Sequence, residues 1–335
     1  MQQGRARPRR RAVIQLGVQR NIGFATVLDV AYVGSVARNL MWQRNINQVP
    51  YGANFAAANQ DPSNPGRPLP INFYRPYPGY GTISYREFAG SSNYHSLQTQ
   101  ANRRFAKGLQ FGFSWTWSKL MNFAEGNFND VATYAPLRAW NYGKGGFDRT
   151  HNVNINYAWD LPRASSMWNN GLVRTVLDGW QLSGITTFMS GAPLGVSLAT
   201  TDNADIAGGG DGVRTVMLAN PVLPKSEQKL TRFFNTEAFG RPATGSFGNA
   251  PKDVFRGPGI NNWDASLMKN IGLPMEGHRL QFRAEFYNVF NHTQFSDVDT
   301  AARFDVAGRQ VNTRFGQLIA ARSPRQIQFS LRYSF

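Results

Sequence analysis

The sequence predicts an all-β fold, an antiparallel transmembrane β-barrel with short periplasmic turns and long extracellular loops. Three observations predict it. Strand-length segments alternate strictly between apolar and polar residues, and short and long connections alternate along the chain. The composition combines 13% aromatic residues with a mean hydropathy of -0.40. Aromatic and polar residues must therefore alternate closely along the chain, as they do in strands with one apolar and one polar face.

The clearest alternation lies in GLQFGFSWTWSK, residues 108–119. Its apolar set is Leu109, Phe111, Phe113, Trp115 and Trp117, and the residues between them are small or polar. A period of two predicts a strand with one apolar and one polar face. The same pattern predicts eight further strands, within residues 13–19, 25–33, 97–105, 151–159, 179–188, 261–270, 280–286 and 325–335. The sequence shows no convincing amphipathic helix.

The two faces of these strands have two alternative explanations. In a soluble sandwich the apolar faces would pack against a second sheet. Ring-rich faces and long loops at only one end of the sheet favour membrane-spanning strands instead. The side chains that we expect to face lipid are Trp115, Trp117, Tyr157, Trp159, Phe282 and Phe286. Those that we expect to face the lumen are Gln110, Asn154, Arg283 and Glu285.

The connections fall into two kinds. Short ones are predicted at residues 20–23, 106–108 and 274–278, with one of medium length at 161–178. The long ones, rich in Gly, Pro, Asn and Asp, cover residues 35–93, 119–150, 190–261 and 291–324. Because the two kinds alternate, all long loops belong to one end of the sheet, as in outer-membrane barrels.

Length and composition limit the other possibilities. The 335 residues suffice for one large or two ordinary domains. No segment approaches the roughly 20 apolar residues of a spanning helix. Cysteine is absent, which excludes disulfides and thiolate metal sites. We expect residues 1–11 to form a basic disordered start and residues 12–335 to form a segment of an outer-membrane barrel.

The charge indicates anionic partners. The formal net charge is +16 and the pI is about 10.5. Nucleic acid, lipopolysaccharide and an acidic solute all fit this balance. The basic residues are spread along the chain outside residues 5–11, and no nucleic-acid-binding motif accompanies them. The expected partners are therefore outer-membrane lipid and lipopolysaccharide, and not nucleic acid.

The sequence predicts no enzyme and no catalytic, cofactor or metal site. The histidines lack ligand spacing, and we expect them in loops or at strand ends; they are His95, His151, His278 and His292. No nucleophile motif of the GxSxG type occurs.

Two loop segments carry side chains with the chemistry of a binding site. Residues 202–212 offer Asp202, Asp205 and Asp211 among glycines, but the bidentate Glu of a calcium loop is missing, which favours a flexible surface loop. In the loop 119–150, three side chains have the chemistry to stack on or pair with a solute, although ordinary loop or aromatic-girdle positions explain them as well. They are Arg138, Trp140 and Tyr142.

Several stretches together resemble the TonB-dependent outer-membrane receptors, and among them the Oar-like group, whose members carry an amino-terminal carboxypeptidase-regulatory-like domain. They include DVAYVGSVARNL, FDRTHNVNINYAWDLP, DGWQLSGITTFMSGAPLGV and LQFRAEFYNVFNHTQF. The resembling segments cover residues 29–40, 94–119, 147–162, 178–196, 233–239, 246–270, 280–295 and 325–335.

The resemblance implies a receptor for scarce large solutes, such as iron chelates or oligosaccharides. Members of the family have a signal peptide, a TonB box and a plug inside a 22-stranded barrel. This sequence matches only the carboxy-terminal part of such a barrel, so we expect it to be inactive alone, with TonB contacts made only through the missing amino-terminal region. The last strand resembles the signal that the barrel-assembly machinery reads, carried by Phe329, Leu331, Tyr333 and Phe335.

Strand parity independently favours a truncated receptor or a partial gene in the outer membrane. Nine strands, counted back from a periplasmic C-terminus, place Met1 outside the cell, whereas bacterial single-chain barrels have even strand numbers. Two alternatives stay open. One is a small self-contained porin for anionic solutes. The other, from a different class, is a soluble basic β-protein that binds nucleic acid.

Overall fold

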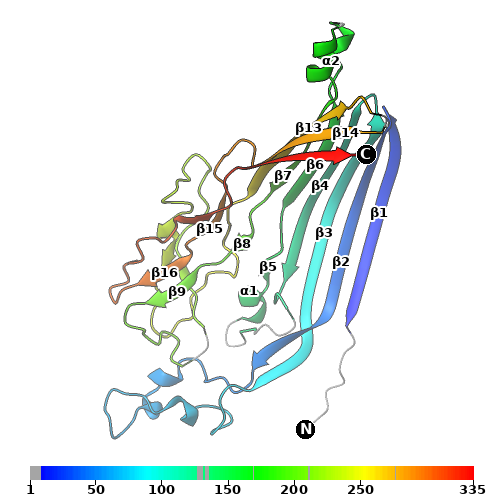
Figure 1. Ribbon diagram of the computed structural model, residues 1–335. Helices are drawn as coiled ribbons and strands as arrows, with labels where there is room; N and C mark the ends of the chain where they lie inside the picture. The colour runs from blue at the N-terminus through cyan, green and yellow to red at the C-terminus, as the bar shows by residue number, and fades with distance from the viewer. Residues whose placement is uncertain (1–8, 127–130, 133–135, 169, 210–211, 276) are drawn as a thin grey trace.

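The computed structural model describes residues 9–126, 131–132, 136–168, 170–209, 212–275 and 277–335 (Figure 1). One large sheet curves through the molecule, and its long loops gather at one end, which we call the loop end. The opposite turn end carries the short hairpin turns and the C-terminus. Within the described ranges, no helix is long and apolar enough to cross a membrane.

The sheet has ten strands, and nine of them follow one another as β1-β2-β3-β4-β6-β7-β13-β14-β18, while β5 (Gly143–Lys144) pairs with β4 beside this path. All pairs along the path are antiparallel. All nine predicted strands are confirmed. Their bounds are β1 Arg10–Gly23, β2 Thr26–Asn45, β3 Ser84–Ala106, β4 Leu109–Asn122, β6 His151–Asp160, β7 Trp180–Met189, β13 Ile260–Gly272, β14 Arg279–Tyr287 and β18 Gln326–Ser334.

Some strands are longer than predicted. β1 starts at Arg10, inside the expected disordered start, and Arg11 donates a hydrogen bond to Ser35 of β2 at 3.2 Å. Residues 1–8 of that start lie outside the described residues. The first long loop shrinks from the predicted 35–93 to 46–83, because β2 and β3 continue past a register shift next to Asn39. Asn39 has a φ of 55°, and the bulge interrupts the alternation that would have revealed the longer strands.

The short turn predicted at 106–108 is confirmed, whereas residues 20–23 belong to β1 and the turn predicted there lies at residues 24–25 instead. Lys107 and Gly108, with φ of 52° and 75°, join β3 to β4, and Phe24 and Ala25, with φ of 52° and 55°, join β1 to β2. Positive φ at both central residues is the geometry whose twist matches that of the flanking strands. Glycine adopts it without strain at Gly108.

The pairing register aligns the apolar positions of neighbouring strands on one face of the sheet and the polar positions on the other. Trp115 pairs with Val153, and Val153 pairs with Phe188, so that rings of successive strands share one face. The six side chains predicted to face lipid all lie on this face, and the four predicted to face the lumen all lie on the other. Two hollows open on the polar face, and each collects side chains from several strands. In outer-membrane barrels the polar face lines the inside of the curved sheet, so we assign the polar face as the concave one and the ring-bearing face as the convex one.

The sheet is open in the part of the chain that the structure describes. β1 and β18 end the strand order, and every residue of both is exposed. Both strands run from the loop end to the turn end, because eight antiparallel steps separate them. Unpaired N–H and C=O groups along such edges are not compatible with lipid. The described strands thus form an open sheet and not the closed barrel of a small porin.

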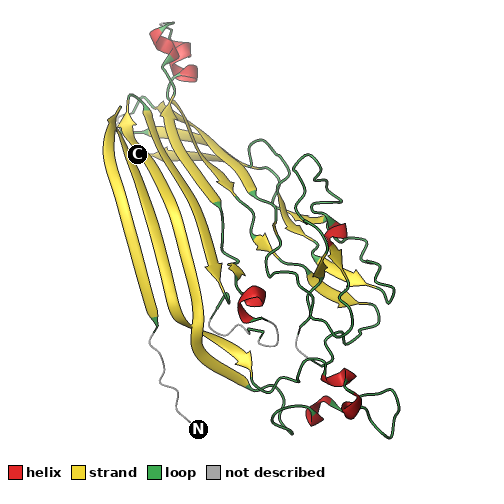
Figure 2. Cartoon of the chain, turned by 180° about the vertical axis from the view of Figure 1, so that it is seen from behind, coloured by secondary structure: helices red, strands yellow, loops and turns green. Residues whose placement is uncertain are grey.

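Helices are few and short. They are α1 Leu137–Asn141 and α2 Gly171–Leu177, with 3-10 turns η1 Ala53–Phe55, η2 Ala57–Asn59, η3 Ile71–Phe73, η4 Ala164–Ser166 and η5 Thr236–Ala238. The expectation that helices are absent is wrong for α2, which lies in the medium connection at the turn end (Figure 2). Seven residues make about two turns, which is too short for a helical period to stand out.

The loops 190–259 and 288–325 fold together into a compact unit, which we call the loop module. Within it, three short antiparallel pairs and one parallel pair connect the segments, and the parallel pair β9–β16 joins the two loops to each other. Its strands are β8 Pro193–Leu194, β9 Ser197–Thr200, β10 Val216–Met217, β11 Phe239–Gly240, β12 Phe255–Arg256, β15 Phe295–Val298, β16 Ala301–Phe304 and β17 Leu318–Ala321.

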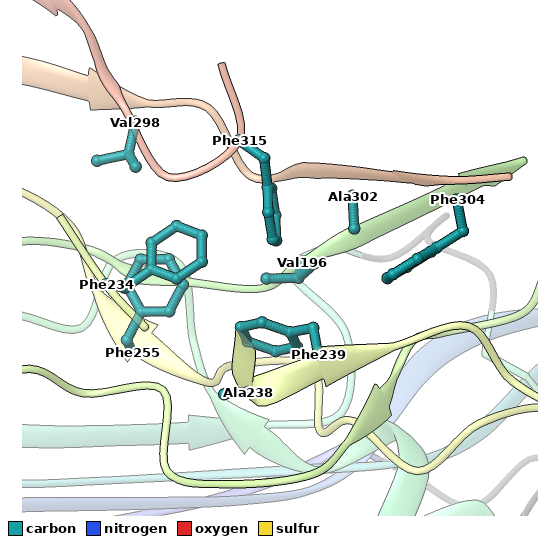
Figure 3. Packing of buried hydrophobic residues seen from close by; sticks show 9 residues of the cluster. All are labelled: Val196, Phe234, Ala238, Phe239, Phe255, Val298, Ala302, Phe304 and Phe315. Atoms are coloured by element: carbon teal, nitrogen blue, oxygen red, sulfur yellow. The ribbon is translucent and has the colours of Figure 1, made fainter. Parts of the chain in front are cut away.

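The loop module contains a hydrophobic core of its own, and Figure 3 shows its side chains pointing toward one another. Phe234 lies at its centre with 1% of its surface exposed. Its ring stacks on Phe255 at 4.3 Å between centroids and meets Phe315 edge-on at 5.1 Å. Aromatic pairs in these geometries add to the stabilisation from burial. The module is therefore a small folded unit built on the strand ends.

Candidate functional site

A hollow of about 890 Å³ opens where β6, β7 and β13 reach the loop end. His151, Phe188 and Ile260 contribute the strand-end part of its lining. Phe233 and Phe255 of the loop module contribute another part. Small-molecule sites usually have volumes of roughly 300–1,000 Å³ and mainly apolar walls with a few polar groups. The hollow has the size and the lining of a solute site.

Glycines set the shape of the chain beside this hollow. Gly191 follows β7, and Gly257 precedes β13. A Cβ atom on Gly191 would overlap the carbonyl oxygen of Gly257, so the two backbones approach as closely as only glycine permits. At this close approach the pairing of β7 with β13 ends, and the two chain segments continue into the loop module, where they pair again as β8 and β12.

The charged groups around the hollow are mostly basic, and no carboxylate belongs to the described lining. Lys144 forms an ion pair with Asp253 at 2.9 Å, and Arg256 forms one with Asp148, whose side chain is fully buried. These two pairs connect the segment before β13 to β5 and to the loop that precedes β6. The exposed Lys225 has no hydrogen bond or ion pair from its side chain within the described ranges. It is the cation most available to a solute.

The polar concave face forms a second, smaller hollow of about 430 Å³. Gln110, Asp264, Ser266 and Glu285 belong to its lining. The Ser266 hydroxyl is buried without a hydrogen-bond partner among the described residues. A buried hydroxyl without a hydrogen-bond partner destabilises a protein unless another group supplies the missing hydrogen bond. This face therefore suits a polar solute or a polar protein segment better than lipid.

Of the three loop residues with the chemistry for solute contact, Trp140 is buried in the loop end, Tyr142 is partly buried and Arg138 is exposed. Trp140 of α1 is 6% exposed, and its ring lies 4.2 Å below the Arg214 guanidinium, which also donates to the Trp140 carbonyl at 2.7 Å. Arg138 lies over the ring of Tyr142 at 4.1 Å. Solute contact by these residues stays a prediction, and so does the alternative that they are ordinary loop or aromatic-girdle residues.

The aspartates of the segment 202–212 are not gathered around a cation position. Asp202 pairs with Arg241 at 3.1 Å, and Asp205 accepts a hydrogen bond from Asn54 at 2.5 Å. Asp211 lies outside the described residues, and no group of three metal-binding side chains occurs in the described part. The expectation of a flexible surface loop is wrong for residues 206–208, because Ile206 and Ala207 are buried and the carbonyls of Ala207 and Gly208 bond to the first long loop.

His151 lies at the start of β6, and His278 and His292 lie in connections, as expected, but the expectation is wrong for His95, which lies in the middle of β3. Three of the four histidines contact aromatic side chains. The Tyr32 hydroxyl and His95 Nδ1 are 2.6 Å apart, and Trp115 Nε1 donates to His151 Nδ1 at 3.2 Å. His278 bonds to the Tyr333 hydroxyl. His292 lies in the lining of the large hollow together with His151, a proximity that their spacing in the sequence did not reveal.

The architecture defines a class before any comparison. A convex face of rings, a concave polar face and long loops at one end are the features of outer-membrane β-barrels. The chain matches the family described as "Outer membrane beta barrel domain" over residues 3–328, and it belongs to that family. It is therefore a protein of the outer membrane, and the alternative of a soluble nucleic-acid-binding protein is not favoured. A search of the curated proteins gives no match.

Similar folds occur among solved transporters and receptors. The outer membrane transporter YddB from Escherichia coli is 10% identical with a TM-score of 0.49, and the match covers 99% of this chain and 33% of that one. The ferric-catecholate import receptor Fiu from E. coli K12 is 10% identical with a TM-score of 0.43, covering 98% and 28%. FpvA of P. aeruginosa, bound to heterologous pyoverdines, is 11% identical with a TM-score of 0.41, covering 98% and 28%. This chain thus spans about a third or less of their lengths.

Proposed function

We propose that this chain supplies membrane-spanning strands and extracellular loops to an outer-membrane receptor of the TonB-dependent type, in its Oar-like group. Its cargo would be a large scarce solute, an iron chelate or an oligosaccharide. The observation that carries the proposal is the large hollow, which lies at the loop end between the strand ends and a folded loop module. A receptor needs a preformed external site of this kind, whereas a general pore does not.

The energy for uptake would come from the TonB complex, which would act through a part of the receptor other than this sheet. The concave polar face offers that part a surface. The hollow on this face contains the Ser266 hydroxyl, which lacks a hydrogen-bond partner, and the carboxylates of Asp264 and Glu285. A polar plug would form hydrogen bonds with these groups.

The last strand would serve recognition by the barrel-assembly machinery. β18 presents its rings on the convex face, and the side chains are unusually exposed for their size. They are Phe329, Leu331, Tyr333 and Phe335, with 65, 66, 48 and 91% of their surfaces exposed. The free edge of β18 offers backbone groups that a strand of the machinery could pair with before the sheet closes.

The function is tested by uptake in cells that produce the receptor containing this chain. A radiolabelled ferric catecholate and a labelled maltooligosaccharide serve as the two probes. We expect uptake of one probe that depends on this chain and stops when the inner-membrane proton gradient is collapsed. Uptake that persists without the gradient would favour the porin alternative. No chain-dependent uptake of either probe would contradict the proposed cargo classes.

A further inference from the structure

The connection between β6 and β7 carries a cluster of exposed apolar side chains, which we call the helix patch. α2 and its flanking residues project beyond the turn end of the sheet (Figures 1 and 2). The members of the patch are Met167, Trp168, Leu172, Val176 and Leu177, with 77, 60, 75, 57 and 46% of their surfaces exposed. A contiguous apolar surface of this kind marks an interaction site rather than a random property of a turn.

The patch is presented by a segment with defined local structure. Asn170 caps α2, and its side-chain oxygen accepts a hydrogen bond from the Leu172 amide at 2.9 Å. The Asp178 carboxylate accepts bonds from both the amide and the hydroxyl of Ser165, which closes the connection into a loop. These hydrogen bonds hold the pKa of Asp178 below its usual range, so the carboxylate is ionised at neutral pH.

Within α2, the apolar and polar residues lie on different faces. Leu172 and Val176 are four residues apart and share one face, which Val173 and Leu177 continue on the helical wheel. Arg174 and Thr175 lie on the other face. An amphipathic helix with this division lies flat on an apolar surface rather than crossing it.

Two contacts attach this segment to the convex, ring-bearing side of the sheet. Trp180 Nε1 donates to the Val176 carbonyl at 2.9 Å, and the Lys269 ammonium donates to the Asp178 carbonyl. Trp180 and Lys269 are register partners on the convex face, and Lys269 is also paired with Phe282 there. The last turn of α2 is therefore held on the side of the sheet that faces lipid, at its turn end.

The charges near the patch suit an anionic surface. Arg163 and Arg174 flank it, Lys269 lies behind it, and the carboxylate within the connection, Asp178, is bound to Ser165. Tryptophan, here Trp168, favours the boundary between acyl chains and headgroups. Basic residues beside a membrane are attracted to anionic phospholipids.

We propose that the helix patch lies in the periplasmic leaflet of the outer membrane and binds anionic phospholipid. The patch continues the apolar convex face past the end of β6 and β7, and its arginines contact the lipid phosphates. The segment thus anchors the turn end of the sheet against the leaflet. This inference concerns lipid and does not depend on which solute the receptor takes up.

The absence of cysteine makes a site-specific test direct. A nitroxide label is placed at Leu177→Cys in the otherwise complete protein, reconstituted in vesicles that contain phosphatidylglycerol. Its collision rates with oxygen, which partitions into lipid, and with a water-soluble nickel chelate are compared. Thr175→Cys on the opposite helix face is the matched control. Ile155→Cys on the convex face and Ser63→Cys in an exposed loop give the lipid and water references.

We expect the label at residue 177 to match the lipid reference and the label at residue 175 to match the water reference. Replacing Arg163 and Arg174 by Gln should shift the label at residue 177 toward the water reference. A label at residue 177 that collides freely with the nickel chelate would overturn the proposal. Low collision rates with both reagents would overturn it too, because the patch would then be covered by protein, either another segment of the receptor or a second copy.

Discussion

The membrane-spanning sheet and the loop module belong to one chain but are stabilised in different ways. The sheet keeps large rings on its outer surface, such as Trp117 with 52% and Phe329 with 65% of the surface exposed. The loop module buries its rings, and Phe234 and Phe304 are each 1% exposed. In lipid, rings gain little from packing inside the protein, and complete backbone pairing is the dominant requirement. In water, the loop module needs an ordinary hydrophobic core.

This difference has a consequence for the two edges of the sheet. β1 and β18 each pair on one side only, so the sheet lacks the backbone partners that lipid demands. The loop module pairs its backbone groups through short strand pairs and loop hydrogen bonds. We therefore expect changes in the sheet to affect membrane insertion, and changes in the module core to have local effects.

The largest effect is expected for the terminal strand. Tyr333→Ser combined with Phe335→Ser should abolish insertion in cells, because the proposed assembly signal is lost. Removing two partly lipid-exposed rings costs only about 2–5 kcal/mol in apolar transfer, which a large folded barrel tolerates. Folded protein is measured by heat-modifiable migration on gels and by surface protease accessibility.

The matched control for the terminal pair is Trp115→Ser combined with Trp117→Ser, on the same convex face of an internal strand. Normal insertion of this control, together with failure of the terminal pair, would support a recognition role. Equal yields from the two pairs would mean that Phe335 and Tyr333 are ordinary membrane-facing rings.

The next largest effect is expected for the module core. Phe234→Ala removes a ring that contacts Phe255, Phe239 and Phe315, and a buried Phe-to-Ala change costs about 3–5 kcal/mol. The module should open and become protease-sensitive, while the heat-modifiable migration of the sheet stays normal. Phe73→Ala, at a loop ring with 69% of its surface exposed, is the control and should leave protease resistance unchanged. Loss of the sheet signal in Phe234→Ala would contradict the separation of the two regions.

A pair of neighbouring substitutions sharpens the assignment of the two faces. Ile155 and Asn154 lie in the middle of β6 on the convex and concave faces. Ile155→Arg should destabilise the inserted sheet by about 2–4 kcal/mol, the cost of a guanidinium at the bilayer midplane. Asn154→Arg should cost much less, because the concave face is polar. Urea titration of refolding into vesicles measures both, and equal costs would refute the face assignment.

The sheet was predictable from the sequence, whereas the loop module was not. The nine strands and the two faces were predictable because alternation is local, as in residues 108–119. The module core was not predicted, because Phe234, Phe255 and Phe315 lie in separate loops without any common period. The large hollow was missed for the same reason, since its lining combines strand ends with separate loop segments, such as those of His151 and His292. Helix α2 was missed because it is too short to show a period.

The smallest effect is expected for an ion pair at the surface of the module. Hydrogen bonds from Arg241 hold the pKa of Asp202 below its usual value. Because the folded pKa is lower than the unfolded value of about 3.9, the stabilisation is complete above that pH and is lost as the pH falls through the folded pKa. Protection of the module from hydrogen exchange, labelled at one common pH after incubation, should be constant from neutral pH down to about 4 and then fall.

Asp202→Asn is the control for this titration. It should lower the protection slightly at neutral pH, as expected for a partly exposed ion pair, and should remove the Asp202 contribution to the acid step. An acid step of unchanged size in Asp202→Asn would assign the titration to another carboxylate, such as Asp305, whose pKa is lowered by hydrogen bonds from the backbone and side chain of Arg309.

The independence of the two regions is tested most directly by pulsed hydrogen exchange along a urea titration of the membrane-inserted receptor that contains this chain. Peptides from residues 190–259 and 288–325 report on the loop module, and peptides from β3, β4, β6 and β7 report on the sheet. We predict two transitions, with the module losing protection at lower urea than the strands. A single transition in which both sets of peptides lose protection together would contradict the account.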